Sequence, residues 1–168
     1  MSSYIKLIIF VVVLVLVSTA IIFVDSSTDS MNKSMHDISD GIVDGDREYN
    51  EAVELVNNKY FYDGMDKAVS AGNNYNKSLL MLKDIQNNYS SDVNSVHQEY
   101  INTVINEVEL KLQAVDLLKQ AIECFEVNSN YTGTNYASEA NDIIYQAKEY
   151  QNQRDGIVSN NSNLFKEI

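Results

Sequence analysis

The side chains that could bind a metal ion gather in an acidic stretch that follows the N-terminal apolar run. They are His36, Asp37, Asp40, Asp44, Asp46 and Glu48. Carboxylate oxygens favour calcium, but an EF-hand loop requires glycine at its sixth position and glutamate at its twelfth. Counted from Asp44, those positions hold Tyr49 and Leu55. We therefore expect no metal site and interpret the stretch as a solvated acidic joint.

The other reactive side chains form no recognisable catalytic or cofactor-binding group. His97 lies three residues after Asn94, where the di-iron sites of helical bundles carry a Glu-x-x-His pair. Cys124 is the only cysteine, which excludes an intrachain disulfide, and no recognisable group activates its thiol. The sequence contains no glycine-rich phosphate loop. We expect no enzyme activity and no cofactor.

Asn-x-Ser/Thr sequons, the acceptors of N-linked oligosaccharides, occur more often than chance predicts. They begin at Asn32, Asn76, Asn88, Asn130 and Asn160, whereas this content of Asn, Ser and Thr predicts roughly two or three. Asn88 and Asn130 fall in predicted loops, and Asn160 lies near a predicted helix end. In a host with the machinery we expect these three positions to accommodate an oligosaccharide.

The run from Leu7 to Val24 is apolar apart from Ser18 and Thr19. As a helix it spans about 27 Å, close to the hydrocarbon thickness of a bilayer. Ser18-Thr19-Ala20 offers small residues for cleavage of a secretory signal, but the apolar run continues to Val24 and exceeds a typical signal core. We favour an uncleaved signal-anchor.

The flanks of this run predict its orientation. Lys6 and the amino terminus are positive, whereas Asp25 and Asp29 begin the other side. Residues 1–6 would be a short cytoplasmic tail, and residues 7–24 a single transmembrane helix in contact with the lipid bilayer. The rest of the chain would lie outside the cytoplasm.

The acidic balance restricts the partners of the exported part. The 168-residue chain carries a formal charge of −12, which repels nucleic acid and anionic lipid headgroups. We expect no nucleic acid partner. Proteins and cell-wall material remain open as partners.

Apolar residues after the run recur at helical spacing, which predicts an all-α class. Gly41 and Gly45 each cost about 1 kcal/mol in a helix interior, so residues 25–46 are expected to be flexible or weakly helical. Residues 47–168 would form the helical bundle. Its strongest helix is predicted from about Ser91-Asp92 to about Val127, followed by a last helix that Thr134 caps.

The segment YNEAVELVNNKYFYDGMDKAVSAGNNYNKSL resembles a single tetratricopeptide-type helical pair, with Tyr62 and Asp63 opening the second helix. No copy follows 34 residues later, so the resemblance implies a helical hairpin and not a repeat scaffold. Periodicity leaves open whether residues 47–86 form one helix or two; we favour two. Short loops then predict an antiparallel up-and-down bundle of three to four helices, with residues 165–168 on the membrane side.

These features predict a membrane-anchored, extracytoplasmic helical bundle that acts as a non-enzymatic surface module, binding a protein or the cell wall. The alternative is a sensory or small-ligand-binding ectodomain. It would act through a partner, because the few residues before Lys6 cannot form an output module. The partner, the molecular activity and the oligomeric state stay open.

Overall fold

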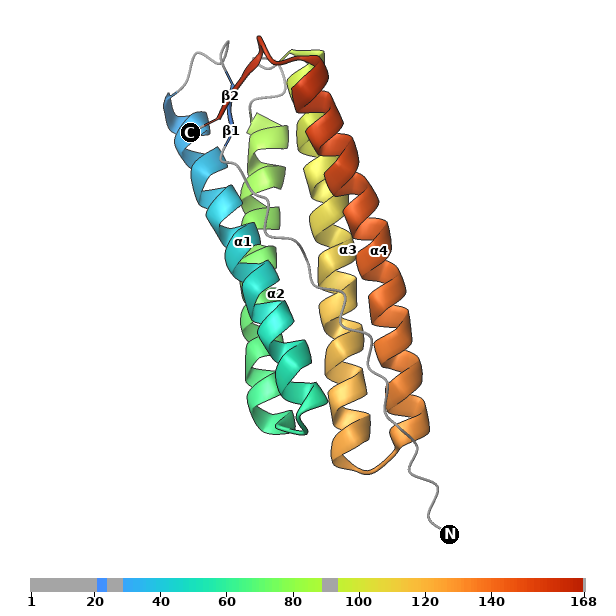
Figure 1. Ribbon diagram of the computed structural model, residues 1–168. Coiled ribbons are helices and arrows are strands. Elements are labelled where there is room, and N and C mark those ends of the chain that lie inside the picture. The colour runs from blue at the N-terminus through green and yellow to red at the C-terminus, as the bar shows by residue number, and fades with distance from the viewer. Residues whose placement is uncertain (1–20, 24–28, 89–93, 168) are drawn as a thin grey trace.

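A computed structural model of the chain describes residues 21–23, 29–88 and 94–167, which form four long helices and two short strands (Figure 1). The elements are β1 (Ile21–Phe23), α1 (Asp29–Asn57), α2 (Phe61–Asn88), α3 (Ser95–Glu126), α4 (Asn130–Asn160) and β2 (Phe165–Glu167). The predicted helical bundle is confirmed.

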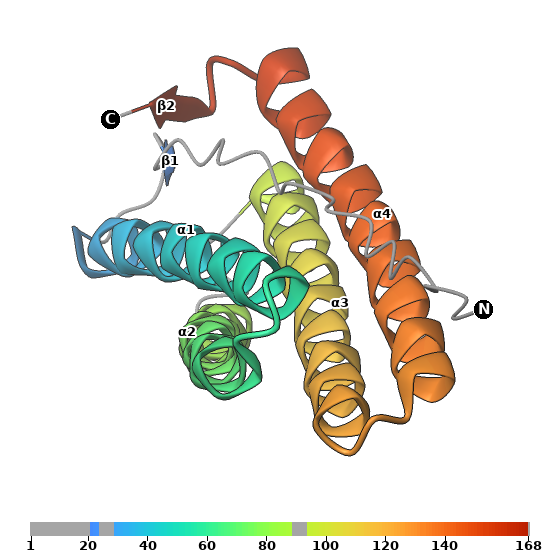
Figure 2. The ribbon, with the colours of Figure 1, turned by 60° about the horizontal axis from the view of Figure 1, so that its bottom comes forward.

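The helices pack as two antiparallel hairpins. Helix α1 packs against α2 and α3 against α4, while α2 packs against α3 and joins the hairpins. Figure 2 shows the two hairpins crossing each other at an angle. The α1–α2 and α3–α4 connections lie at one end of the bundle, and the paired strands lie at the other (Figure 1).

The boundary between α1 and α2 confirms that residues 47–86 form two helices. Helix α1 ends at Asn57, and Lys59 adopts a left-handed conformation with φ of 65°. The Asn58 side chain donates a hydrogen bond to the Glu54 carbonyl at 3.0 Å, and the Tyr60 N–H donates one to the Leu55 carbonyl. These bonds satisfy carbonyls of the last turn, which have no partner within the helix.

Helix α1 differs from the flexible or weakly helical segment expected over residues 25–46, because it is continuous from Asp29 through Gly41 and Gly45. Residues 25–28 of that segment lie outside the described residues. A Cβ atom at Gly41 would overlap the Ser78 hydroxyl of α2, and one at Gly45 would overlap the Tyr75 ring. The two glycines thus allow α1 and α2 to approach closely. This packing offsets the low helix propensity of glycine.

The starts of the last two helices also differ from expectation. Helix α3 begins at Ser95, where the Asn94 side chain accepts a hydrogen bond from the His97 N–H at 2.9 Å. Residues 91 and 92, the predicted cap, lie outside the described residues. Helix α4 begins at Asn130 and not at Thr134. Gly133 lies within its first turn. A Cβ atom at this position would overlap the Phe125 ring, so only a residue without a side chain fits here.

The two strands hold the first and last described elements together. They pair antiparallel, with Ile21 opposite Glu167 and Phe23 opposite Phe165. The Phe23 ring stacks on the His97 ring at 4.2 Å and meets the Phe165 ring edge-on at 5.8 Å. We call this arrangement of β1, β2 and His97 the terminal clip. It places the end of the chain beside the end of the apolar run.

The predicted transmembrane helix is not confirmed. Residues 7–20 and 24 lie outside the described residues, and the remaining three, Ile21–Phe23, form a strand instead of a helical turn. Across the part of the chain that the structure describes, no helix is both long and apolar enough to cross a membrane.

Candidate functional site

A network of four charged side chains lies inside the bundle. Asp46 comes from α1, Glu107 and Lys111 from α3, and Arg154 from α4; we call them the charge cluster. All four are buried, and Glu107 and Lys111 are at most 1% exposed. Tyr75 completes the arrangement from α2, so every helix contributes.

Lys111 lies at the centre of the charge cluster. Its Nζ is 2.8 Å from Oδ1 of Asp46 and 2.8 Å from Oε1 of Glu107. The Tyr75 hydroxyl donates a hydrogen bond of 2.6 Å to Asp46, and Lys111 Nζ lies 5.7 Å from the centre of the Tyr75 ring. Arg154 Nη1 lies 3.1 Å from the second oxygen of Glu107. Two positive and two negative groups are therefore paired away from water.

The electrostatics of the charge cluster keep Lys111 protonated at neutral pH. Burial lowers the pKa of Lys111, but the negative charges of Glu107 and Asp46 outweigh burial and raise the pKa above its usual range. Burial also raises the pKa of the Asp46 carboxyl, although the Lys111 charge and the bonds from Lys111 and Tyr75 oppose this. A protonated lysine without access to solvent cannot serve as a nucleophile.

The arrangement therefore suits a structural role. Asp46 and Tyr75 belong to the first hairpin, whereas Glu107, Lys111 and Arg154 belong to the second. A buried charge without its partner is strongly destabilising, so the cluster penalises any other docking of the two hairpins. We therefore expect the charge cluster to favour this one register.

The sequence did not predict this cluster. Asp46 was expected in a solvated joint but is 6% exposed, and no prediction placed Glu107, Lys111 or Arg154 in the core. A signal existed, because Glu107 and Lys111 are one turn apart and follow the helical period of the buried Val104 and Val108. Charged residues on that period indicate a buried ion pair.

The other residues of the acidic stretch are dispersed around α1. Asp44 pairs with Arg47 at 2.7 Å, and Glu48 pairs with Lys67 of α2 at 3.0 Å. His36 and Asp40 approach to 3.8 Å on the exposed side of the helix. Over the described residues, no three histidine, cysteine or acidic side chains come together as a metal site would require.

The predicted glycosylation sites differ in accessibility. Asn76, Asn88, Asn130 and Asn160 are exposed. Asn32 is half-buried, and its side chain accepts a hydrogen bond from the Phe23 N–H at 3.1 Å in the terminal clip. The Ser78 hydroxyl, which belongs to the Asn76 sequon, is buried and donates to the Ile38 carbonyl at 3.2 Å. Asn88, Asn130 and Asn160 thus remain the predicted acceptors.

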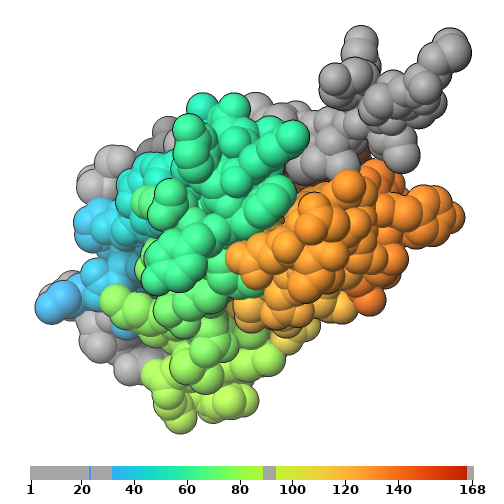
Figure 3. Space-filling view, turned by 90° about the horizontal axis from the view of Figure 1, so that it is seen from below, coloured from blue at the N-terminus to red at the C-terminus, as the bar shows by residue number. Residues whose placement is uncertain are grey.

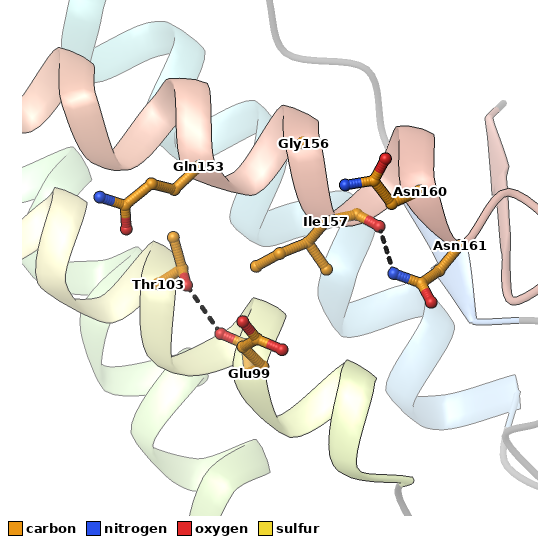
Figure 4. Close-up of a pocket in the computed structure, with 7 residues that line it drawn as sticks. All are labelled: Glu99, Thr103, Gln153, Gly156, Ile157, Asn160 and Asn161. Carbon is orange, nitrogen blue, oxygen red and sulfur yellow. Dashed lines mark hydrogen bonds between the residues drawn. The ribbon is translucent and has the colours of Figure 1, made fainter.

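A polar groove lies between α3 and α4, with a volume of about 510 Å³ (Figure 4). Glu99 and Thr103 line it from α3; Gln153, Gly156, Ile157 and Asn160 line it from α4, and Asn161 lines it from the position after that helix. The Thr103 hydroxyl donates a hydrogen bond to the Glu99 carbonyl, and the Asn161 amide donates one to the Ile157 carbonyl. A Cβ atom at Gly156 would meet no atom within 4 Å, so the groove is open at this position.

Exposed apolar side chains gather at the end of the bundle opposite the terminal clip. Tyr60 and Tyr62 are 60% and 75% exposed, and Val127 and Tyr131 are 74% and 82% exposed. We call these four residues the tip. The first two flank the start of α2, and the last two flank the α3–α4 connection. Figure 3 looks onto this end and shows the two connections side by side.

The tip stands on a packed base. Phe61 stacks on Phe125 with 5.9 Å between ring centres, which joins the start of α2 to the end of α3. Asn128 adopts a left-handed conformation with φ of 59°, which closes the α3–α4 connection within a few residues. The exposed side chains therefore project from a preorganised surface.

Comparison with protein-family models, with curated proteins and with solved structures gives no match for this chain. A functional assignment therefore depends on the charge cluster, the groove and the tip.

Proposed function

We propose that the chain is an exported, non-enzymatic surface protein that binds another protein through the tip. The observation that supports this most directly is the exposure of three tyrosines and one valine on two adjacent connections. Tyrosines are enriched at the energetic centres of protein interfaces, because each offers a large, rigid apolar area with one polar end. The tip is the surface with this composition at the end farthest from β1.

The packing of the base supports binding. A surface that is already ordered loses little conformational entropy when a partner docks. Phe61 and Phe125 hold the two connections together, so the four side chains of the tip keep their spacing. A flexible pair of loops would lose more affinity for the same contact area.

Export is supported by the apolar run Leu7–Val24, with Lys6 before it and acidic residues after it. The formal charge of −12 agrees with an exposed domain that must stay in solution. The proposed function requires export of the bundle. It does not require that the apolar run remains covalently attached to the bundle.

Site-specific crosslinking tests the tip. A photoreactive amino acid replaces Tyr131 in the full chain, and in a matched variant it replaces Tyr145, which is 55% exposed on α4 outside the tip. After irradiation of intact producing cells we expect a discrete adduct from position 131 and none from position 145. Equal adducts from both positions, or none from either, would contradict the proposal.

The chemistry of the adduct separates a protein partner from cell-wall material. An adduct that protease digestion shortens to the chain plus a peptide supports a protein partner. An adduct that only polysaccharide-degrading enzymes shorten overturns that part of the proposal and assigns the tip to the cell wall. Tyr60→Ser, Tyr62→Ser and Tyr131→Ser, combined in one variant, should remove the interaction and leave the melting temperature nearly unchanged.

The groove between α3 and α4 favours a second candidate, the binding of a small polar ligand. Glu99, Gln153 and Asn160 offer a carboxylate and two amides around the partly buried Ile157. Gly156→Leu would introduce an apolar side chain at this position, where an added Cβ atom meets no neighbour within 4 Å. If a monosaccharide or an amine raises the melting temperature of the natural chain but not of Gly156→Leu, the groove is a binding site. No shift with any of these ligands would exclude this candidate for those classes.

A further inference from the structure

We infer that the exported chain is cleaved between Ala20 and Ile21, so that the folded protein begins with the first residue of β1. This inference rests on the proposed export and concerns the fate of the apolar run. It replaces the interpretation of residues 7–24 as a permanent membrane anchor.

The first observation is that the end of the apolar run belongs to the folded domain. Phe23 is 1% exposed, and its ring contacts His97, Tyr100 and Phe165. The Phe23 N–H donates a hydrogen bond to Asn32, and all three residues of β1 pair with β2. Burial of a phenylalanine contributes about 2 kcal/mol or more. Residues 21–23 therefore form part of the folded bundle, where the Phe23 ring is shielded from water.

The second observation concerns the length of the apolar run that remains before β1. If Ile21–Phe23 form a strand, the remaining apolar run is Leu7–Ala20, which as a helix spans about 21 Å. The hydrocarbon core of a bilayer is about 30 Å thick and needs roughly 20 apolar residues to cross it. A membrane-spanning helix and the terminal clip would thus compete for the same three residues.

The shortened run has the features of a secretory signal. Lys6 supplies the positive start, and Leu7–Val17 supplies an apolar core of 11 residues, within the usual range of about 7–15. Ser18 and Ala20 then place small side chains three residues and one residue before the proposed bond. Signal peptidases recognise small residues at these two positions and accept larger ones between them.

The reaction is a hydrolysis. Water adds to the carbonyl carbon of Ala20, the Ala20–Ile21 amide bond breaks, and the products are a carboxylate on Ala20 and an α-ammonium group on Ile21. The released segment contains one of the 12 basic residues and no acidic residue, so the side-chain charge changes from −12 to −13. The mature chain keeps the complete terminal clip and has no covalent link to the membrane.

The test is to express the full chain in cells that export it and to determine its intact mass, its N-terminal sequence and its location. We expect a chain that begins at Ile21 and is found outside the cytoplasm. Ser18→Gln and Ala20→Gln should each abolish cleavage, whereas the matched Thr19→Gln should be processed normally. These positions precede β1, so a failure to fold cannot explain a loss of cleavage.

The other outcomes separate the two proposals. A full-length chain in the membrane with its C-terminus outside would overturn cleavage and leave the proposed function intact. A full-length chain inside the cytoplasm would overturn both. A mature chain that begins at any residue other than Ile21 would overturn the assigned bond.

Discussion

Oδ1 of Asp46 lies 2.8 Å from Nζ of Lys111, which is 65 residues farther along the chain. This contact joins α1 of the first hairpin to α3 of the second, in addition to the packing of α2 against α3. Because Glu107 also holds Lys111, the position of this one ammonium group depends on both hairpins. The contact therefore reports whether the bundle is correctly assembled.

Lys111→Met should lower the free energy of unfolding by about 3–5 kcal/mol, because it leaves the carboxylate of Asp46 buried without its cation. Urea denaturation measures this change. The double variant Asp46→Asn with Lys111→Met removes both charges, keeps the Glu107–Arg154 pair, and should recover most of the loss. If the double variant were less stable than Lys111→Met alone, the cost would come from lost packing and not from the unpaired charge.

The bundle should unfold at alkaline pH. Burial raises the pKa of Tyr49, of Tyr75 and, to about 12, of Tyr100 above the ordinary value of 10.0. A folded-state pKa above the unfolded value contributes stability that is fully present below about pH 10 and is lost as the pH rises further. For Tyr100 alone the loss amounts to roughly 2 kcal/mol by pH 12. The raised pKa of Lys111 acts in the same direction.

Tyrosinate absorbance and circular dichroism, recorded together between about pH 9 and pH 12, check this prediction. Three of the 11 tyrosines should ionise only as the helices unfold. Tyr100→Phe should shift the unfolding midpoint to higher pH, whereas Tyr145→Phe, at an exposed position, should not. Ionisation of all tyrosines before any loss of helix would show that the three rings are accessible.

Two glycines in helix interiors should respond in opposite ways to substitution by alanine. Gly156→Ala should raise the free energy of unfolding by about 0.5–1 kcal/mol, because the helix gains propensity and the new methyl group meets no neighbour. Gly45→Ala should lower it by about 1–2 kcal/mol, since the methyl group overlaps the ring of Tyr75, which its bond to Asp46 holds in place. Thermal or urea unfolding measures both. Equal effects would mean that α2 does not pack closely on Gly45.

The terminal clip should behave as one cooperative unit. Phe23→Ala and Phe165→Ala should each lower stability by about 3 kcal/mol, because both rings are buried and face each other. The double variant should lose less than the sum of the two, since either change alone removes their contact. Leu80→Ala, at a 62% exposed position of α2, is the matched control and should have little effect. Additive losses would indicate that the strands do not pair.

Sequence periodicity predicted the helical parts of the fold well. The resemblance to a helical pair, with Tyr62 and Asp63 opening the second helix, indicated the turn between α1 and α2, and the structure places that turn between Asn57 and Phe61. These signals are local, since capping and turn preferences depend on residues within a few positions of each other. The continuity of α1 was missed because it depends on how close α2 comes to Gly41 and Gly45.

The charge cluster and the terminal clip could not be predicted in the same way. Lys111 follows the helical period of the buried Val104 and Val108, but its partner Asp46 comes from another helix, and periodicity cannot identify that partner. A strand of three residues such as β1 is too short to show alternation, and its partner lies at the other end of the chain. Both features depend on contacts between residues far apart in sequence.

The pairing of Phe23 with Phe165 also determines when the protein can finish folding. At about 5–20 residues per second, the ribosome needs on the order of ten seconds to make the chain between them. Throughout that time β1 has an unpaired hydrogen-bonding edge, and the Phe23 ring is uncovered. Such an edge can pair with other chains. Helices α1 to α4 can form and dock while synthesis continues. The terminal clip can form only after β2, which lies near the end of the sequence, has been synthesised. A message truncated there would yield a nearly complete bundle with a permanently exposed N-terminal strand.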